Sequence, residues 1–413
     1  MCGAGSGTPE QSTCGPSVRD VRADRPGCRD RGPSTVADMG PSVGLPRMHK
    51  EPGERRDFLP ELVGRLDRFG AREVVLEEGY GSGIGIAVDD YLRASGRARV
   101  ASHRECLEQD VVVVLRSPEH EELRRLRRGA VLVSMLHYAT RPERTALLAD
   151  LGVRAVSLDA ITDGSGRRLV ENLESVAWNG VRAAFREIQR RHPNFDHPSR
   201  RPLHVTCLGA GGVGGWAVLA STRYGDPQLR EALVAINVPG VEVTVVDFDL
   251  TLHEDYMLER LEWTDLLIDA TRRSDPSRPV VPNTWLSALP ADAVLLDLAC
   301  DPYDLAATPP VVKGIEGVPH GSLDRYVFPA DDDAWDRIDP RIDTRNRRVA
   351  LSCYSWPGLE PVQSMRTYGQ QLEPILAVVL EKPTGEWGVK DSSQVEHALA
   401  RAEVSTWMRT QAA

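Results

Sequence analysis

Short apolar runs rich in valine and leucine alternate along the chain with segments whose apolar residues recur every three or four positions. Runs such as REVVLEEG, DVVVVLR, AVLVSML and VRAVSL are typical of strands, whereas PELVGRLDRFG, HEELRRLRRG and RPERTALLADLG have helical spacing. Strands that are apolar on both sides and joined by helices indicate a parallel sheet covered on both faces. The pattern therefore predicts an α/β fold.

A second alternating set begins at LHVTCLG and ends near RVALSCYS, and long amphipathic helices flank it. One of these helices covers residues 171–192 and precedes the proline-rich PNFDHPSRRP, and the other begins near Gly358. We predict two Rossmann-like domains with parallel sheets and an active site in the cleft between them. They are a substrate (catalytic) domain over residues 46–195, completed by 358–413, and a nucleotide-binding domain over residues 196–357.

Residues 1–45 lack any apolar period and are rich in Gly, Pro, Ser, Arg and Asp. Such a segment cannot bury enough apolar surface to offset the entropy of ordering. We expect a disordered N-terminal tail, or else a true start at Met39 or Met48.

The composition restricts the class of protein. Of the 413 residues, 41% are hydrophobic and 27% are charged, as in globular proteins with a sizeable core. A net charge of −10 disfavours a nucleic-acid partner, because phosphate contacts need clustered Lys and Arg. No apolar run approaches the roughly 18 residues of a membrane span. The seven cysteines form no CxxC pair, which favours neither a disulfide framework nor a zinc site. We expect a cytoplasmic protein without a bound metal, and the oligomeric state stays open.

The segment LHVTCLGAGGVGGWAVLA carries glycines in the order G-x-G-x-x-G, directly after a predicted strand and at the start of a helix. Gly209 permits the tight turn, Gly211 lets the backbone approach a pyrophosphate, and Gly214 allows close packing of helix on strand. The helix N-terminus offers free N–H groups to phosphates. This context predicts a dinucleotide cofactor.

The run VEVTVVDFD supplies a second strand that ends at Asp247, a suitable acceptor for a ribose 2′-hydroxyl. Asp247 lies 33 residues after Gly214, whereas the usual interval is about 20, and we assign the extra chain to a lengthened helix and loop. A carboxylate at this place repels a 2′-phosphate, so NAD is favoured over NADP. Asp249 is the alternative ribose partner.

Charged residues follow several predicted strands at the edge where open parallel sheets bind ligands. They are Arg116, His137 and Asp159 in the first domain and Asp301 in the second. Each alone is more typical of a solvated strand end. Only His137 has an ordinary pKa that suits proton transfer near neutral pH, so we predict it as catalytic and Asp159 as substrate-binding.

Motifs spread over most of the chain occur in the order KEPGERRDFLPEL, VVVVLRSP, SMLHYATRPERTALLADLG, GAGGVGG, VTVVDFD, VLLDLACD and YSWPGLEPVQS. In this order, from about residue 50 to 380, the chain resembles the superfamily of alanine dehydrogenases and transhydrogenase N-domains, which includes the lysine-forming saccharopine dehydrogenases. LDAITDGSGRRLVENLESVAWNG is most similar to the saccharopine dehydrogenase branch, where an acidic strand end precedes a D-x-x-G-R-R turn.

The resemblance implies a role for each matching residue. Arg56, with Arg55 as an adjacent alternative, would hold a substrate carboxylate through a bidentate pair. By position, His137 matches the catalytic histidine of the family, and Asp301 matches its acidic residue after a strand. Ser355 lies where the family has a loop near the nicotinamide.

Arg116 departs from the family, which has an active-site lysine at the matching position. An arginine stays charged, because its pKa lies above about 12, so it can hold a carboxylate but cannot act as a base. We therefore predict that Arg116 binds substrate electrostatically within the active site. Either His137 alone carries the proton, or the chemistry differs from that of the family.

These residues together predict an NAD-dependent amino-acid dehydrogenase that oxidises the C–N bond of a secondary amine. Its substrate would be a saccharopine- or opine-like N-substituted amino acid, and the products an oxo compound and an amine. Two alternatives stay open. One is an alanine-dehydrogenase-like oxidation of a primary amino acid, and the other is a nucleotide-binding homologue without turnover, which the replacement of lysine by Arg116 favours.

Overall fold

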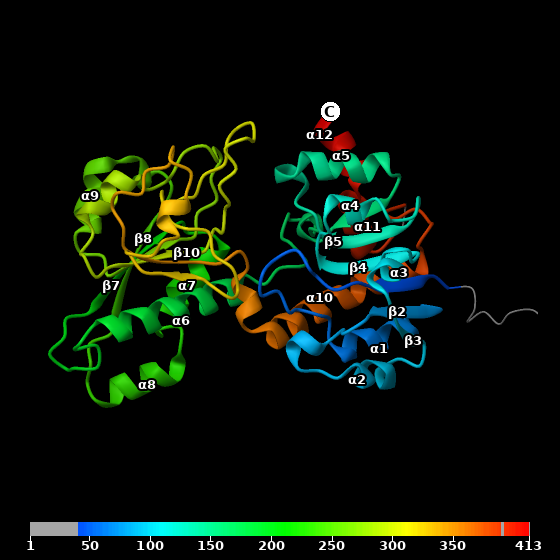
Figure 1. Ribbon diagram of the computed structural model, residues 1–413, viewed down its shortest axis with the longest axis horizontal. Coiled ribbons are helices and arrows are strands. Elements are labelled where there is room, and N and C mark those ends of the chain that lie inside the picture. Colours follow the sequence, from blue (N-terminus) through cyan, green and yellow to red (C-terminus); the bar gives the residue numbers. More distant parts are fainter. Residues whose placement is uncertain (1–39, 390–391, 413) are drawn as a thin grey trace, which may run out of the picture.

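Two lobes, each built on one six-stranded sheet, make up the computed structural model, which describes residues 40–389 and 392–412 (Figure 1). Helices cover both faces of each sheet, so the predicted α/β fold with two Rossmann-like domains is confirmed. Residues 1–39 of the predicted tail lie outside the described part of the chain. In the described ranges no helix is long and apolar enough to cross a membrane.

The first sheet is parallel throughout and has the strand order β3-β2-β1-β4-β5-β6. Its strands are β1 (Ser42–Leu45), β2 (Glu73–Glu77), β3 (Ala98–Ala101), β4 (Val111–Arg116), β5 (Val131–Met135) and β6 (Arg154–Ser157).

The central strand β1 corrects the predicted boundary of the tail at residue 45. Val43 and Leu45 are almost fully buried, and β1 pairs with both β2 and β4. The sequence pattern missed this strand because it has only four residues, contains Gly44 and lies between two prolines. Gly44 is required by packing, since a Cβ there would lie 1.9 Å from the carbonyl oxygen of Cys106.

Strand β4 is buried on both faces, as its run of valines predicts. Val111, Val113 and Leu115 belong to the core on one face of the sheet, and Val112 and Val114 belong to the core on the other face. A strand covered on both sides has no polar face, so alternation is absent from its sequence.

The helices of the first lobe come from both ends of the chain. The long helix α10 packs on α1, and its buried Met365, Leu372 and Leu376 share a core with Val43 of β1. The helices are α1 (Pro60–Arg68), α2 (Val88–Ala94), α3 (His103–Leu107), α4 (His120–Leu123), α5 (Pro142–Asp150), α10 (Pro361–Glu381), α11 (Gln394–Ala402) and α12 (Val404–Ala412).

The second sheet has the order β11-β12-β10-β9-β7-β8, with β11 antiparallel and the other strands parallel. Its strands are β7 (Leu203–Leu208), β8 (Val241–Val246), β9 (Leu266–Asp269), β10 (Val294–Asp297), β11 (Val327–Phe328) and β12 (Val349–Ser352). The helices near it are α6 (Leu173–Arg191), α7 (Gly212–Ser221), α8 (Pro227–Ala235) and α9 (Glu254–Leu261).

Helix α6 corrects the predicted domain boundary at residue 195. The buried face of this helix, with Val181, Ala184 and Ile188, packs in one core with Val205 and Leu296 of the second sheet. An amphipathic pattern shows that a helix has an apolar face but does not show which sheet covers it. The first lobe therefore ends before α6 begins.

The chain passes between the lobes twice, and the two connections lie side by side. The first leads from β6 to α6, and the second leads from β12 to α10 through the short helix η8 (Trp356–Leu359). Asn179 Nδ2 donates to the carbonyl oxygen of Trp356 at 3.1 Å, and Gln371 Nε2 donates to the carbonyl oxygen of Glu171 at 2.8 Å. Hydrogen bonds thus tie each connection to the other.

We expect the substitution Gly44→Ala to destabilise the protein by roughly 1–3 kcal/mol, the usual cost of overpacking a core. Gly96→Ala is the matched control, because a Cβ at Gly96 meets nothing within 4 Å. Chemical denaturation of both variants measures the effect. Equal stability of the two variants would contradict the placement of β1 in the centre of the sheet.

Candidate active site

The glycine turn between β7 and α7 has the geometry that close approach of a phosphate requires. Gly209 has a φ of 94°, which an L side chain rarely adopts, and a Cβ on Gly214 would lie 2.0 Å from the carbonyl oxygen of Gly209. Around Gly211, by contrast, an added Cβ would meet nothing within 4 Å. The first and third glycines are therefore needed by the fold, and the second leaves its outer side open to a ligand.

Two acidic residues follow the edge strand β8, and the structure distinguishes them. Asp249 accepts a hydrogen bond from the backbone N–H of Leu250 at 2.9 Å and so caps a short 3-10 helix. Asp247 is exposed directly after the strand, and within the described ranges its carboxylate makes no hydrogen bond. Asp247 is thus the freer ribose acceptor, and its role stays a prediction.

His137 and Asp159 lie together at the carboxyl ends of β5 and β6. His137 has a left-handed φ of 53°, its backbone N–H donates to Asp159 Oδ1 at 3.2 Å, and its Nδ1 lies 3.4 Å from Asp159 Oδ2. Burial raises the pKa of Asp159, but hydrogen bonds from His137 and Ser157 outweigh burial and hold it well below its usual range. The carboxylate is therefore charged at neutral pH and orients the imidazole, whose side chain is 53% exposed.

Arg116 emerges from β4 toward the second lobe. Its Nη2 donates to Glu51 Oε1 at 3.1 Å, and the guanidinium carbon lies 4.6 Å from the ring centroid of Tyr354, which follows β12. This distance is within the range of a cation–π contact. Because β4, β5 and β6 are neighbours in the sheet, Arg116, His137 and Asp159 end adjacent strands at one edge.

Arg56 is buried and already holds a carboxylate of the chain itself. Its Nε donates to Glu54 Oε1 at 2.8 Å and its Nη2 to Glu54 Oε2 at 2.5 Å, a bidentate pair with both side chains at most 2% exposed. Arg55 points elsewhere and pairs with Asp324 of the second lobe at 2.6 Å. A substrate carboxylate would therefore have to share Arg56 with Glu54, and its role as a clamp stays a prediction.

A cleft of about 460 Å³ lies between the lobes, a size within the range of small-molecule sites. Glu51 and Pro52 line it from the loop after β1, and Tyr303, His320 and Tyr354 line it from the second lobe. The hydroxyl of Tyr354 also lies 3.4 Å from the carbonyl oxygen of Pro52. Glu51 and Tyr354, which contact Arg116, thus line the cleft, whereas Arg116, His137, Asp159 and the glycine turn are not among its lining residues.

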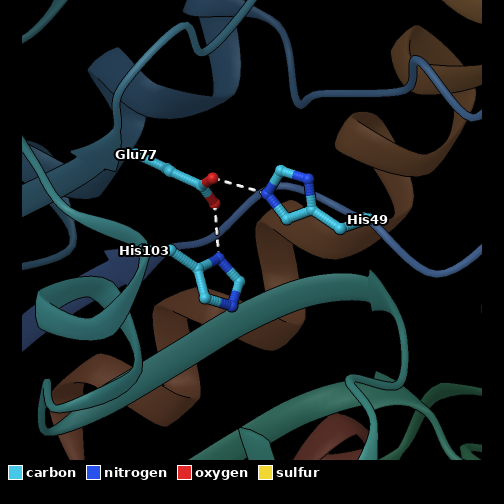
Figure 2. A group of neighbouring side chains, drawn as sticks. All are labelled: His49, Glu77 and His103. Carbon is cyan, nitrogen blue, oxygen red and sulfur yellow. Dashed lines mark hydrogen bonds and ion pairs between the residues drawn. The ribbon is translucent and has the colours of Figure 1, made fainter.

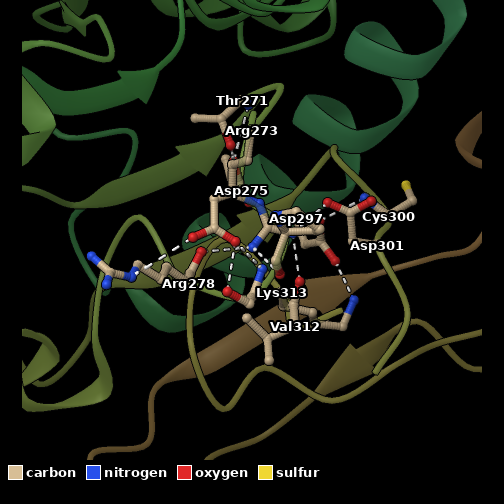
Figure 3. Close-up of polar contacts among 12 residues, drawn as sticks. Thr271, Arg273, Asp275, Arg278, Asp297, Cys300, Asp301, Val312 and Lys313 are labelled. Atoms are coloured by element: carbon tan, nitrogen blue, oxygen red, sulfur yellow. Dashed lines mark hydrogen bonds and ion pairs between the residues drawn. The ribbon is translucent and has the colours of Figure 1, made fainter. Parts of the chain in front are cut away.

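Asp301, the predicted acidic residue of the second lobe, is paired with an arginine that sequence reasoning did not select. Arg273 Nη2 donates to Asp301 Oδ2 at 2.7 Å and also to the carbonyl oxygen of Val312 (Figure 3). Asp301 has a side chain 40% exposed, so one face of its carboxylate stays open to solvent. The described residues of the first lobe make no hydrogen bond or ion pair with it.

Beneath Asp301, the strand ends of the second sheet hold a buried acid cluster that the sequence analysis missed. Lys313 Nζ donates to Asp297 Oδ2 at 2.5 Å and to Ser352 Oγ at 3.1 Å, and all three side chains are at most 3% exposed. Asp269 ends β9 and lies opposite Asp297 of β10. Its Oδ1 accepts a hydrogen bond from the Thr271 hydroxyl, while its Oδ2 has no hydrogen-bond partner in the described part of the chain.

The two buried carboxyl groups of this cluster titrate in opposite directions. Burial raises the pKa of Asp297, but the ammonium of Lys313 outweighs burial and keeps it below its usual range. Burial and the charge of Asp297 raise the pKa of Asp269 to about 6. In the sequence, this cluster was indicated only by the lysine in the apolar segment PPVVKGIEG. Its acidic partner, Asp297, becomes evident only in the structure, where β10 and the loop of Lys313 lie together.

His320 is a second residue that the sequence gave no reason to select. It lines the cleft, and desolvation by partial burial together with the positive charges of Lys313 and Arg116 lowers its pKa to about 4. The imidazole is therefore neutral at pH 7 and can accept a hydrogen bond from a ligand in the cleft.

Ser355, predicted to lie near the nicotinamide, directly precedes η8 and is half-buried. The next residue, Trp356, is fully buried, and its indole N–H donates to the carbonyl oxygen of Asp297 at 2.8 Å. Ser355 is thus fixed at the connection between the lobes, close in sequence to the cleft residue Tyr354.

The fold and these residues define a two-lobed α/β protein. One lobe has a Rossmann-type glycine turn, and in the other lobe Arg116 and His137 lie at the carboxyl edge of the sheet. Residues 44–178 match the family model described as "Alanine dehydrogenase/PNT, N-terminal domain". The alanine dehydrogenase of Bacillus subtilis is 30% identical over 135 residues, which are 33% of this chain and 35% of that protein. The alanine dehydrogenase of Halomonas elongata is 26% identical over 266 residues, 58% of this chain and 66% of that protein.

A solved structure named L-alanine dehydrogenase is similar over 88% of this chain and 94% of that chain, with a TM-score of 0.65 and 19% identity. This likeness shows the fold. The matched part of this chain spans less than two thirds of each of the two relatives above. Because these relatives are alanine dehydrogenases, they support the predicted superfamily but not a place within it closest to the saccharopine dehydrogenases.

We expect Asp269→Asn to change the pH dependence of stability. A carboxyl group whose folded pKa is raised to about 6 binds more protons in the folded than in the unfolded state, so its contribution to stability falls as pH rises from about 4 to about 6. The free energy of unfolding of the variant, relative to the unchanged protein, should rise by roughly 2 kcal/mol between pH 4 and pH 7. Urea denaturation at both pH values measures it, and a pH-independent difference would contradict the raised pKa.

Proposed function

We propose that this protein is an NAD-dependent amino-acid dehydrogenase whose active site lies in the cleft between the lobes. The observation that carries the proposal is the position of Arg116, which leaves the ligand-binding edge of the first sheet and stacks on Tyr354 of the second lobe. His137 and Asp159 end the two neighbouring strands at that edge. The alanine dehydrogenases among the relatives support the same class of enzyme.

NAD is the proposed cofactor, and the residues of the second lobe fit it. The open side of Gly211 would receive the pyrophosphate at the N-terminus of α7, and the exposed Asp247 would accept hydrogen bonds from the ribose. A negative charge at Asp247 disfavours the 2′-phosphate of NADP. When bound, NAD supplies the hydride acceptor, and Ser355 is proposed to lie near its nicotinamide.

The residues of the first lobe would bind the substrate and move its proton. Arg116, and Arg56 on the side not taken by Glu54, would hold the carboxylate of the amino acid. His137, oriented by the charged Asp159, would accept the proton that leaves the amine as hydride leaves its carbon. Asp159 is thus proposed to act on the substrate through the imidazole that it orients.

Water then completes the reaction on the resulting imine. Addition of water to the carbon and departure of the nitrogen as ammonia or amine give the oxo compound. Asp301, open to solvent on one face, is proposed to orient this water or the leaving ammonium. Arg116 cannot take part as a base. Once His137 has released the first proton to solvent, it would also take the proton of the water and pass it to the leaving nitrogen.

A primary amino acid is the proposed substrate, because the relatives above are alanine dehydrogenases. The secondary amine predicted from LDAITDGSGRR remains the second candidate. That segment forms a tight turn in which Asp163 accepts hydrogen bonds from Ser165 and Arg167. Arg167 and Arg168 are exposed there, which leaves both available to a second carboxylate.

The direct test follows NADH formation at 340 nm with the full-length protein. We expect reduction of NAD in preference to NADP, with alanine or another primary amino acid and not with saccharopine or other N-substituted lysines. Activity with the secondary amines alone would reverse the choice of substrate. Tight NAD binding by calorimetry with no turnover on either class would support the nucleotide-binding homologue.

We expect Arg116→Met to raise KM for the amino acid by about 10- to 100-fold, the equivalent of one charged hydrogen bond, with a smaller fall in kcat. Glu51→Gln is the matched control, because it removes the internal partner of Arg116 but leaves the guanidinium in place. Its KM should stay within about fivefold of the unchanged value, as for a partly exposed ion pair. Equal effects of both substitutions would mean that Arg116 serves only to hold Glu51.

A further inference from the structure

A group of two histidines and one glutamate lies at the carboxyl edge of the first sheet, near Arg116 but with none of the proposed catalytic residues among its members. His49 Nε2 lies 2.5 Å from Glu77 Oε1, and His103 Nδ1 lies 2.7 Å from Glu77 Oε2 (Figure 2). One ligand atom from each of the three residues lies within 4.8 Å of the other two. His49 follows β1, Glu77 ends β2 and His103 opens α3, so three separate segments bring them together.

The surroundings of His103 match those of a metal-binding imidazole. Its second ring nitrogen, Nε2, lies 2.8 Å from Glu122 Oε1. Histidines that bind metals almost always donate their other N–H to a carboxylate or carbonyl, which fixes the ring and its tautomer. Glu77 is oriented as well, because Oε2 also accepts from the backbone N–H of Arg47 at 2.6 Å.

The site also has an open side. The side chain of His49 is 51% exposed, while that of Glu77 is only 8% exposed. A small cavity of about 10 Å³, lined in part by His49, Arg116 and Glu122, lies beside it, and this volume is about that of one water. Three protein ligands with room for water are the arrangement in which zinc keeps an exchangeable position.

We propose that His49, Glu77 and His103 bind one divalent transition-metal ion of the Zn²⁺ type, with water in a fourth position and Glu122 supporting His103. Two imidazoles and one carboxylate form a donor set that favours such ions over Mg²⁺ or Ca²⁺, which prefer oxygen ligands. The proposal goes beyond the dehydrogenase function and does not depend on it.

The metal would fix the start of the loop that reaches the second lobe. His49 lies two residues before Glu51, the partner of Arg116, and three before Pro52, which contacts Tyr354. Tying His49 to Glu77 on β2 therefore limits the movement of the loop at its first-lobe end.

The sequence analysis predicted no metal, because it searched for cysteine pairs. The ligands here are 28 and 26 residues apart along the chain, and only the parallel arrangement of β1, β2 and β3 brings them to one edge.

The experiment uses the full-length protein after dialysis against a chelator. Isothermal titration with Zn²⁺ should show one site per chain with a Kd of about 1 μM or tighter, and the midpoint of thermal unfolding should rise with the Zn²⁺ concentration. Co²⁺ as a spectroscopic probe should give visible d–d bands of a nitrogen- and oxygen-ligated ion.

Variants assign the binding to these residues. His49→Ala, on the exposed side of the site, should keep the fold and weaken Zn²⁺ binding by at least about tenfold, and Glu122→Gln should weaken it by about 10- to 100-fold. His253→Ala, an exposed histidine of the second lobe, is the matched control and should bind Zn²⁺ as the unchanged protein does. Absence of saturable Zn²⁺ binding in the unchanged protein would overturn the proposal and leave a network of ion pairs. Unchanged affinity in His49→Ala would overturn it equally.

Discussion

The buried ion pair between Glu54 and Arg56 fixes a loop of the first lobe that contacts the second lobe. Both side chains are out of contact with water, so neither charge can be left alone without a cost of about 3–5 kcal/mol. The pair fixes the conformation of the loop after β1, in which both residues lie. The neighbouring residues of that loop then reach across, with Arg55 pairing with Asp324 and Pro52 contacting Tyr354. The buried pair thus lies next to the residues through which the loop contacts the second lobe.

The charges at the two sheet edges are distributed unevenly. The first lobe presents Arg116 and the exposed His137, each paired with a carboxylate of its own lobe. The second lobe presents Asp301 above the buried pair of Asp297 and Lys313. An amino acid carries both charges, so a cation at one sheet edge and an acid at the other would suit it electrostatically. Lys313 keeps the deeper acid charged without exposing that acid to the ligand.

Long apolar runs made most of the fold predictable, because a strand covered on both faces is continuously apolar in sequence. The four-residue β1 is too short for that signal, and α6 has an apolar face that fits either sheet. Strand-end residues such as Arg116 and His137 could be selected because all parallel strands end at one edge. The partners that define their chemistry, Glu51 and Tyr354 among them, are distant in sequence or on the other lobe, and no spacing rule reaches them.

The two connections between the lobes, bonded to each other through Asn179 and Gln371, have a mechanical consequence. One flexible connection would let the lobes swivel about any axis, whereas two connections side by side restrict them to rotation about the line that joins the points of crossing. Closure of the cleft would then be a hinge rotation of the two lobes about a single axis. Its far edge would travel most, and residues next to η8, such as Ser355, would hardly move.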